Sequence, residues 1–336
     1  MSSHIISSKL NANELALCGG FAGLTTRLAI SPLDVVKIRL QVQPERYTLR
    51  QLLSKQAKNN IKYSGITQAF KTILAEEGVK GFFKGNVAAE WLYVTYGISQ
   101  FYAYYFLDDF MKKQHQVSPA IKPFISGMLA GSFATATTYP FDLLRTRFAM
   151  QGETRVYNNM LHAVLDIYEK EGVRGFYRGL GSSITQIMPY MGLMFFSYEG
   201  LCSMAQSLKD KKVIPEDHKR MQDMLCGSLA GIISKTGVFP LDVVRKRLQV
   251  QGPHMSEYVV SKIPSYSRDN SVLGCIRKMV ATEGVWSLYK GIVPGLLKAG
   301  PSGAVYFLMF ELAKDGITVL KESGFRIVSD KSTLNT

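Results

Sequence analysis

The chain has few cysteines, few histidines and little charge for its size. Its four cysteines form no CxxC pair, and its five histidines share no metal-ligand spacing with them. We therefore expect no metal site. We also find no convergent set of nucleophile, base and metal ligands, so we expect neither an enzyme nor a bound cofactor. Residues 1–10 lack the patterns of a signal peptide and of a transit peptide, and we expect no cleavage there.

The charge that is present is strongly basic and unevenly placed. Charged residues are 20% of the chain and hydrophobic residues 46%, yet the formal net charge is +14. A nucleic-acid binder would gather basic residues on one face among aromatic residues. Here they concentrate in three connecting regions, 46–84, 155–178 and 262–290, between long apolar stretches. This pattern favours loops on one side of a membrane, which attract anionic lipid or substrate, and we expect no nucleic-acid partner.

Two motifs occur three times. The first, Pro-x-Asp-x-x-Lys/Arg-x-Lys/Arg, lies within residues 31–39, 139–147 and 239–247. The second, Glu-Gly followed by an aromatic residue, a base and a glycine, spans 77–85, 171–179 and 283–291 with identical internal spacing. Internal repeats of this kind decide the architecture. We predict three repeats, at 1–115, 116–213 and 214–336.

Each repeat reads as two long apolar helices joined by a basic loop that carries a short helix. We predict the six long helices near residues 13–43, 85–112, 119–150, 180–207, 219–250 and 292–320. These lengths exceed the roughly 20 residues that span a bilayer, which indicates tilt. The predicted fold is an all-α membrane protein with six tilted transmembrane helices in three pseudo-symmetric repeats.

The charges inside the proline-containing helices must be shielded from lipid. Asp34, Lys37 and Gln41 share one helical face, and Arg27 lies two turns earlier on it. Each charge facing lipid costs about 2.5 to 3.5 kcal/mol. Each of the three motifs carries three charged positions, and nine charges facing lipid would cost roughly 25 kcal/mol in total. This is more than the net stability of a typical domain. A single Pro-x-Asp could be a kinked helix end with a solvated cap, but three copies favour a ring of paired acids and bases.

These motifs resemble the signature of the mitochondrial carrier family over nearly the whole chain. The resemblance implies a monomeric, multi-pass transporter of the mitochondrial inner membrane that works by alternating access. It also implies a matrix gate closed by ion pairs and braced by glutamines, although the second repeat has Ala149 at the glutamine position. The implied gate residues are Asp34, Lys37, Gln41, Asp142, Arg145, Asp242, Arg245 and Gln249.

The resemblance implies a second gate on the cytoplasmic side, built from an aromatic residue, an acid and a base in each repeat. Only the third repeat has all three, because Cys202 and Asp108 stand where the other two bases would be. The implied residues are Tyr104, Tyr198, Glu199, Phe310, Glu311 and Lys314. We therefore hypothesise that the unliganded protein rests open to the cytoplasm, with its matrix gate closed.

Lipid contacts are implied where a glycine opens each second long helix, since free N–H groups there can hold a phosphate. Cardiolipin is the family's ligand at these places. The implied residues are Gly65, Lys84, Gly85, Arg178, Gly179, Lys290 and Gly291. The regions around Tyr157 and Tyr266 depart from the companion aromatic-x-Gly motif.

The family's substrate positions align with Arg27, Tyr93, Thr135, Gln186, Lys235 and Lys298 in this sequence. Three bases among them suit a phosphorylated or carboxylate substrate near the membrane midplane. Any single base could instead snorkel or pair with an acid such as Glu90. Within the family the chain looks most like carriers that exchange thiamine pyrophosphate for nucleotides or phosphates. Carriers of coenzyme A or adenine nucleotide, and a membrane scaffold that does not transport, are the alternatives.

Overall fold

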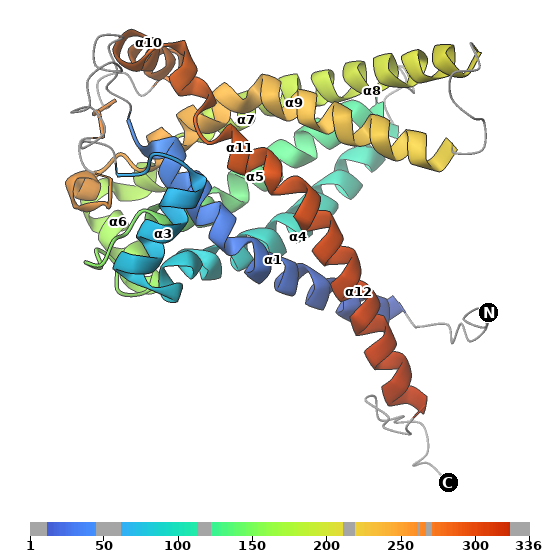
Figure 1. The fold of residues 1–336 in the computed structure, drawn as a ribbon, viewed down its shortest axis with the longest axis horizontal. Coiled ribbons are helices and arrows are strands. Elements are labelled where there is room, and N and C mark those ends of the chain that lie inside the picture. Colours follow the sequence, from blue (N-terminus) through green and yellow to red (C-terminus); the bar gives the residue numbers. More distant parts are fainter. Residues whose placement is uncertain are drawn as a thin grey trace. The chain divides into compact units, whose positions relative to one another are not determined.

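The computed structural model describes residues 12–44, 62–112, 122–210, 219–260, 263–266 and 271–322. Within these ranges every regular element is a helix (Figure 1). The chain divides into two compact units, each treated by itself below. The first takes its residues from Met1–Pro32 and Leu297–Thr336, and the second comprises Leu33–Leu296.

The three proline-containing helices are present as predicted. They are α1 (Ala12–Val42), α5 (Lys122–Ala149) and α9 (Lys219–Gln249). Each continues through its proline and carries a basic residue in its last turn, where a cation is favourable against the helix dipole. The predicted start of the middle helix, residues 119–121, lies outside the described residues.

The second long helix of each repeat is continuous only in the first repeat. α4 spans Asn86–Lys112 without interruption. The predicted helix 180–207 is instead two, α7 (Leu180–Thr185) and α8 (Ile187–Asp210), and the predicted helix 292–320 is also two, α11 (Ile292–Leu297) and α12 (Ala299–Glu322). The prediction of unbroken helices is therefore wrong in two repeats.

Both breaks lie next to a proline. A proline inside a helix removes one N–H donor and clashes with the carbonyl four residues earlier. Pro189 and Pro301 lie four residues after Thr185 and Leu297, where α7 and α11 end. Thr95 occupies the matching position in α4, and its hydroxyl bonds back to the carbonyl of Trp91 at 2.5 Å within a continuous helix.

A short helix follows each proline-containing helix, as predicted. These are α3 (Ile66–Glu77), α6 (Met160–Phe176) and α10 (Val272–Glu283). α3 and α10 end at a glycine with positive φ, and α6 is kinked at one. Tight 3₁₀ turns follow as η2 (Val79–Phe83) and η5 (Val285–Tyr289), and a further turn, η4 (Pro253–Glu257), lies after α9.

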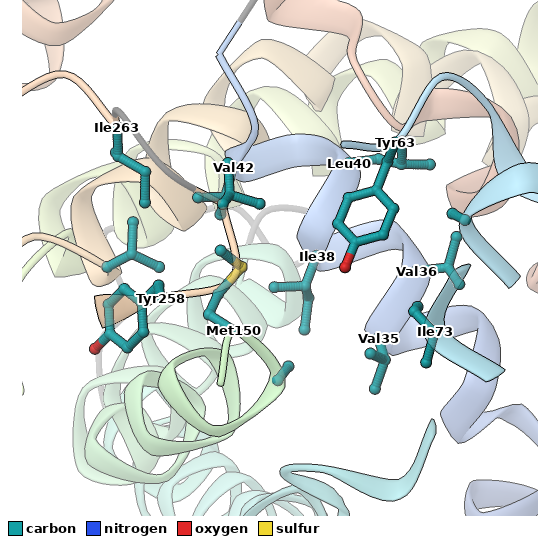
Figure 2. Close-up of a cluster of buried hydrophobic side chains, with 14 of the residues drawn as sticks. Val35, Val36, Ile38, Leu40, Val42, Tyr63, Ile73, Met150, Tyr258 and Ile263 are labelled. Carbon is teal, nitrogen blue, oxygen red and sulfur yellow. The ribbon is translucent and has the colours of Figure 1, made fainter. Parts of the chain in front are cut away.

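The main hydrophobic core of the second unit lies at the signature end of the long helices. Figure 2 shows Val36 of α1 near Ile73 of α3, and Ile38 on the side of Met150, which follows α5. Tyr258, from the segment after α9, belongs to the same cluster. Along the helices, α4 lies beside α5 and α8 beside α9 (Figure 1). Their outer apolar side chains are left uncovered, and Phe101 and Phe196 are 80% and 79% exposed. Large uncovered apolar surface is expected of helices that face lipid.

Hydropathy alone identifies fewer spans than the repeats do. Among the described residues, two segments are long and apolar enough by this measure, Met224–Gln249 and Val285–Thr318. The remaining long helices are recognised as spans only through the threefold repeat.

Candidate functional site

The six charged side chains predicted to form a ring do form three ion pairs, here called the signature ring. The bonded atoms are Lys37 Nζ and Asp242 Oδ2 at 2.7 Å, Arg145 Nη2 and Asp34 Oδ2 at 2.8 Å, and Arg245 Nη2 and Asp142 Oδ2 at 2.9 Å. Each base pairs with an acid of another repeat, so the pairs link α1, α5 and α9 in a closed cycle. No side chain in the ring is more than 17% exposed, and the pairing offsets the cost of burying these charges.

Two glutamines brace the ring. Gln41 Nε2 donates to Asp242 Oδ2 at 3.2 Å, and Gln249 Nε2 donates to Asp142 Oδ2. Ala149 has no amide to offer at the third position. The ion pairs of Asp242 and Asp142 therefore each have a glutamine beside them, whereas no glutamine stands at the corresponding position of the second repeat.

Aromatic rings lie beneath two of the ring's bases, a feature that the sequence prediction missed. Lys37 Nζ is 5.7 Å from the ring centroid of Phe239, and Arg245 Cζ is 5.5 Å from that of Tyr139. Such contacts add cation–π attraction. Both aromatics directly precede a signature proline, whereas the first repeat has Ser31 there. An aromatic residue before the proline in two of the three repeats was the sequence signal that could have predicted these contacts.

The last base of each signature motif forms a second layer, here called the arginine belt, which the prediction also left out. Its members are Arg39, Arg147 and Arg247, and their side chains are at most 1% exposed. Each guanidinium forms a fork of two hydrogen bonds with the glutamate of its own repeat's Glu-Gly motif, Glu77, Glu171 or Glu283.

The arginine belt also joins neighbouring repeats through helix ends. Arg39 Nε donates to the carbonyl of Ala149 at 2.9 Å, and Arg147 Nε donates to that of Gln249 at 3.1 Å. Arg247 Nε closes the cycle by donating to the carbonyl of Gln41 at 3.2 Å. The last carbonyls of a helix lack partners within it, so each arginine satisfies the end of the next long helix.

The glycines assigned to lipid also have a packing role. Gly85, Gly179 and Gly291 have φ of +81°, +86° and +76°, which disfavours other residues. A Cβ on Gly85 would lie 2.5 Å from the carbonyl oxygen of Arg145. A Cβ on Gly179 or Gly291 would approach the carbonyl of Arg245 or Lys37 to within 3.3 Å. Each glycine thus lets its chain approach a ring base of another repeat.

The bases assigned to lipid are held by the protein. Lys84 Nζ lies 2.5 Å from both Glu77 Oε2 and the carbonyl of Gly152, and Lys290 Nζ donates to the carbonyl of Gln43 at 2.8 Å. Arg178 pairs with Glu171 at 3.0 Å. Gly65, the N-cap of α3, has extended backbone and open space around it. Lipid binding at these positions stays a prediction.

Four of the predicted substrate residues lie in the second unit. Lys235 Nζ is 3.7 Å from Asp242 Oδ2, so it is a second cation beside that ring acid. Gln186 lies in the break between α7 and α8, and within the described residues its buried Oε1 has no hydrogen-bond partner. Thr135 Oγ1 donates to the carbonyl of Gly131 at 2.7 Å, and Tyr93 is 51% exposed.

The other two predicted substrate residues lie in the first unit. Arg27 is buried within α1, and Lys298 is half-buried at the break between α11 and α12. Both breaks in the long helices therefore coincide with residues aligned to substrate positions, Gln186 and Lys298.

The residues predicted for a cytoplasmic gate fall in both units. Glu199 of α8 lies in the second unit, and Glu311 and Lys314 of α12 lie in the first. All three are exposed, and among the described residues of its own unit none of them forms an ion pair. Phe310 stacks on Tyr306 at 6.3 Å within α12, and Tyr104 is 38% exposed. Tyr198 lies one residue before Glu199 in α8.

Comparison with known proteins gives a consistent answer. The sequence profile described as "Mitochondrial carrier protein" matches residues 8–115, 116–208 and 216–320. Proteins named "Mitochondrial thiamine pyrophosphate carrier 1" from Neosartorya fischeri and Aspergillus oryzae are each 43% identical, over 89% of this chain and 91% of theirs. One from Coccidioides immitis is 41% identical over 92% of this chain and 93% of its own.

Proposed function

Because this chain belongs to the mitochondrial carrier family, whose members are multi-pass transporters of the mitochondrial inner membrane, we propose that it imports thiamine pyrophosphate. We further propose that it does so by alternating-access exchange for a nucleotide or phosphate. The observation that carries the substrate is the identity of 40% or more to relatives named for that cofactor, over nine-tenths of both chains.

The predicted substrate residues supply groups that match the cofactor. Thiamine pyrophosphate combines a diphosphate anion with a cationic thiazolium ring and an aminopyrimidine. Arg27, Lys235 and Lys298 offer cations for the diphosphate, which arginine and lysine bind through charge-assisted hydrogen bonds. Within the described residues Gln186 Oε1 accepts no hydrogen bond, so it can act as an acceptor for an amino group. An aminopyrimidine would supply the missing donor.

The two helix breaks support the assignment of Gln186 and Lys298 to the substrate pathway. Pro189 and Pro301 free the backbone carbonyls of Thr185 and Leu297 from their helical partners. In a membrane, irregular backbone is tolerated where it is buried in protein or lines a water-filled cavity. Transporters use such discontinuous helices at their substrate sites.

The signature ring supports the gating part of the proposal. The ring would close the matrix side, and its three pairs must separate for the substrate to leave there. Because Cys202 and Asp108 stand where the cytoplasmic gate would need a base, the unliganded protein would rest open to the cytoplasm. Cardiolipin at the openings of the second long helices, and a monomeric working unit, complete the proposal.

Transport by purified protein in liposomes tests this function. Labelled thiamine pyrophosphate should enter liposomes preloaded with nucleotide, and Arg27→Ala, Lys298→Ala and Gln186→Leu should each reduce uptake. Lys62→Ala is a matched control, since Lys62 forms a partly exposed ion pair with Glu76 away from the ring. Preferential uptake of coenzyme A or adenine nucleotide would contradict the substrate. Failure to transport any of them would indicate a scaffold instead.

A further inference from the structure

A buried lysine, Lys246, adds contacts to one of the three ion pairs of the signature ring, and the other two pairs have no equivalent lysine. Lys246 follows Arg245 in α9, and its side chain is 8% exposed. Its Nζ lies 3.1 and 3.2 Å from the two carboxylate oxygens of Asp142 in α5. It also lies 2.9 Å from Thr146 Oγ1 and 2.9 Å from Gln249 Oε1.

These contacts satisfy the ammonium group completely. A lysine ammonium has three N–H donors and no acceptor. The carboxylate, the hydroxyl and the amide oxygen give it three acceptors of different kinds. An unpaired charge at this depth would be costly, whereas a paired and fully hydrogen-bonded one is tolerated. Each N–H donor of Lys246 therefore has an acceptor within reach.

The other repeats have no such cation. The position between the two bases of the signature is Ile38 in the first repeat, Thr146 in the second and Lys246 in the third. Asp142 consequently receives Arg245, Lys246 and Gln249, all from α9. Separating α5 from α9 must break two ion pairs to one carboxylate, plus the bond between Lys246 and Thr146.

We propose that Lys246 is a positioning residue that latches α5 to α9 and so sets how often the matrix side of the ring opens. The latch rests on the proposed alternating access, because only a gate that opens needs one. It is distinct from the ring itself, whose three pairs are already complete without Lys246. Its loss leaves those pairs in place and favours the separated state.

Distances between spin labels on the two repeats measure this directly in the unliganded protein. Labels at Glu153→Cys, just after α5, and Thr282→Cys, in α10, would be placed on exposed positions with the four native cysteines changed to serine. Lys246→Ile and Lys246→Thr introduce the residues of the other two repeats. Each should raise the population of the longer distance by about tenfold, since a hydrogen bond to a charged group shifts an equilibrium by at least that factor.

Three further variants separate a latch from a general structural role. Lys246→Arg keeps a cation and should stay near the wild-type distribution. Thr146→Val removes the hydroxyl that accepts from Lys246 and that also lies 2.7 Å from Gln249 Oε1, while it keeps Lys246 and its contact with Asp142. It should shift the distribution in the same direction by a smaller amount. Lys62→Ile removes an ion pair within the first repeat and should change nothing.

The measurement needs no substrate, so its failure and that of the proposed substrate are distinguishable. If Lys246→Ile and Thr146→Val both give the Lys62→Ile distribution, the latch is wrong whatever the protein transports. If the distances shift as expected while thiamine pyrophosphate is not taken up, the latch stands and the substrate assignment fails. If Lys246→Ile does not fold, Thr146→Val alone decides.

Discussion

Replacing Glu77 by glutamine should strongly destabilise the protein, because it removes the only carboxylate in the described contacts of a buried arginine. Arg39 is 0% exposed and Glu77 is 2% exposed. All five guanidinium donors of Arg39 are used, by Glu77, Tyr63 Oη and the carbonyls of Ala149 and Gln151. Breaking a buried pair from one side costs about 3–5 kcal/mol. The charge lost here is shared with Lys84, so the upper half of this range is expected.

Thermal unfolding of purified protein provides the assay. A loss of this size should lower Tm by at least about 5 °C. Glu76→Gln is the matched control, because Glu76 is the adjacent residue and its side chain, 43% exposed, pairs with Lys62. Exposed pairs contribute about 0–1 kcal/mol, so its Tm should barely change. Equal shifts in the two variants would refute the reasoning about the arginine belt.

The same carboxylate predicts an acid dependence. Burial alone would raise the pKa of Glu77, but hydrogen bonds and charge from Arg39 and Lys84 outweigh it and hold the pKa below its ordinary value of 4.5. A carboxylate with a lowered pKa in the folded state stabilises the protein above that ordinary value. This contribution is lost as pH falls through the folded-state pKa. The Tm difference between wild type and Glu77→Gln should therefore be constant above about pH 6 and shrink below pH 4.5.

Three further predictions concern the packing around the ring. Gly85→Ala should abolish transport, because its φ is +81° and the new Cβ would meet the carbonyl of Arg145 at 2.5 Å. Gly316→Ala, in open space on α12, should keep activity in the same uptake assay. Phe239→Leu should lower stability by about 1–2 kcal/mol in thermal unfolding, since it removes the ring beneath Lys37; an unchanged Tm would remove the cation–π contribution. Pro189→Ala should join α7 to α8, raising Tm and slowing uptake, and faster uptake would contradict a role for the break.

The repeats and the ring could be predicted because both follow from spacing. Asp34 and Lys37 share a helical face, and threefold repetition leaves charges at those positions few ways to avoid lipid. The prediction of three acids paired with three bases needed no knowledge of helix packing. The same spacing placed Gln41 on that face, whereas Gln249 was assigned to the ring through the resemblance to the family.

The departures from symmetry were harder to predict. Pro189 and Pro301 were a signal for the breaks after Thr185 and Leu297, but α1, α5 and α9 continue through their prolines, so proline alone does not decide where a helix breaks. The contacts of Lys246 could not have been predicted. The sequence alone does not show whether the position between the two signature bases faces the neighbouring helix, which depends on how α5 and α9 pack. The inward contacts of Lys84 and Lys290 also depend on carbonyls that only the folded helix ends present.

Counter-exchange in liposomes tests the central claim most directly. Purified protein should take up labelled thiamine pyrophosphate in a saturable way, and faster into liposomes loaded with nucleotide or phosphate than into empty ones. Uptake no faster than in protein-free liposomes, or a clear preference for coenzyme A or adenine nucleotide over thiamine pyrophosphate, would contradict the account.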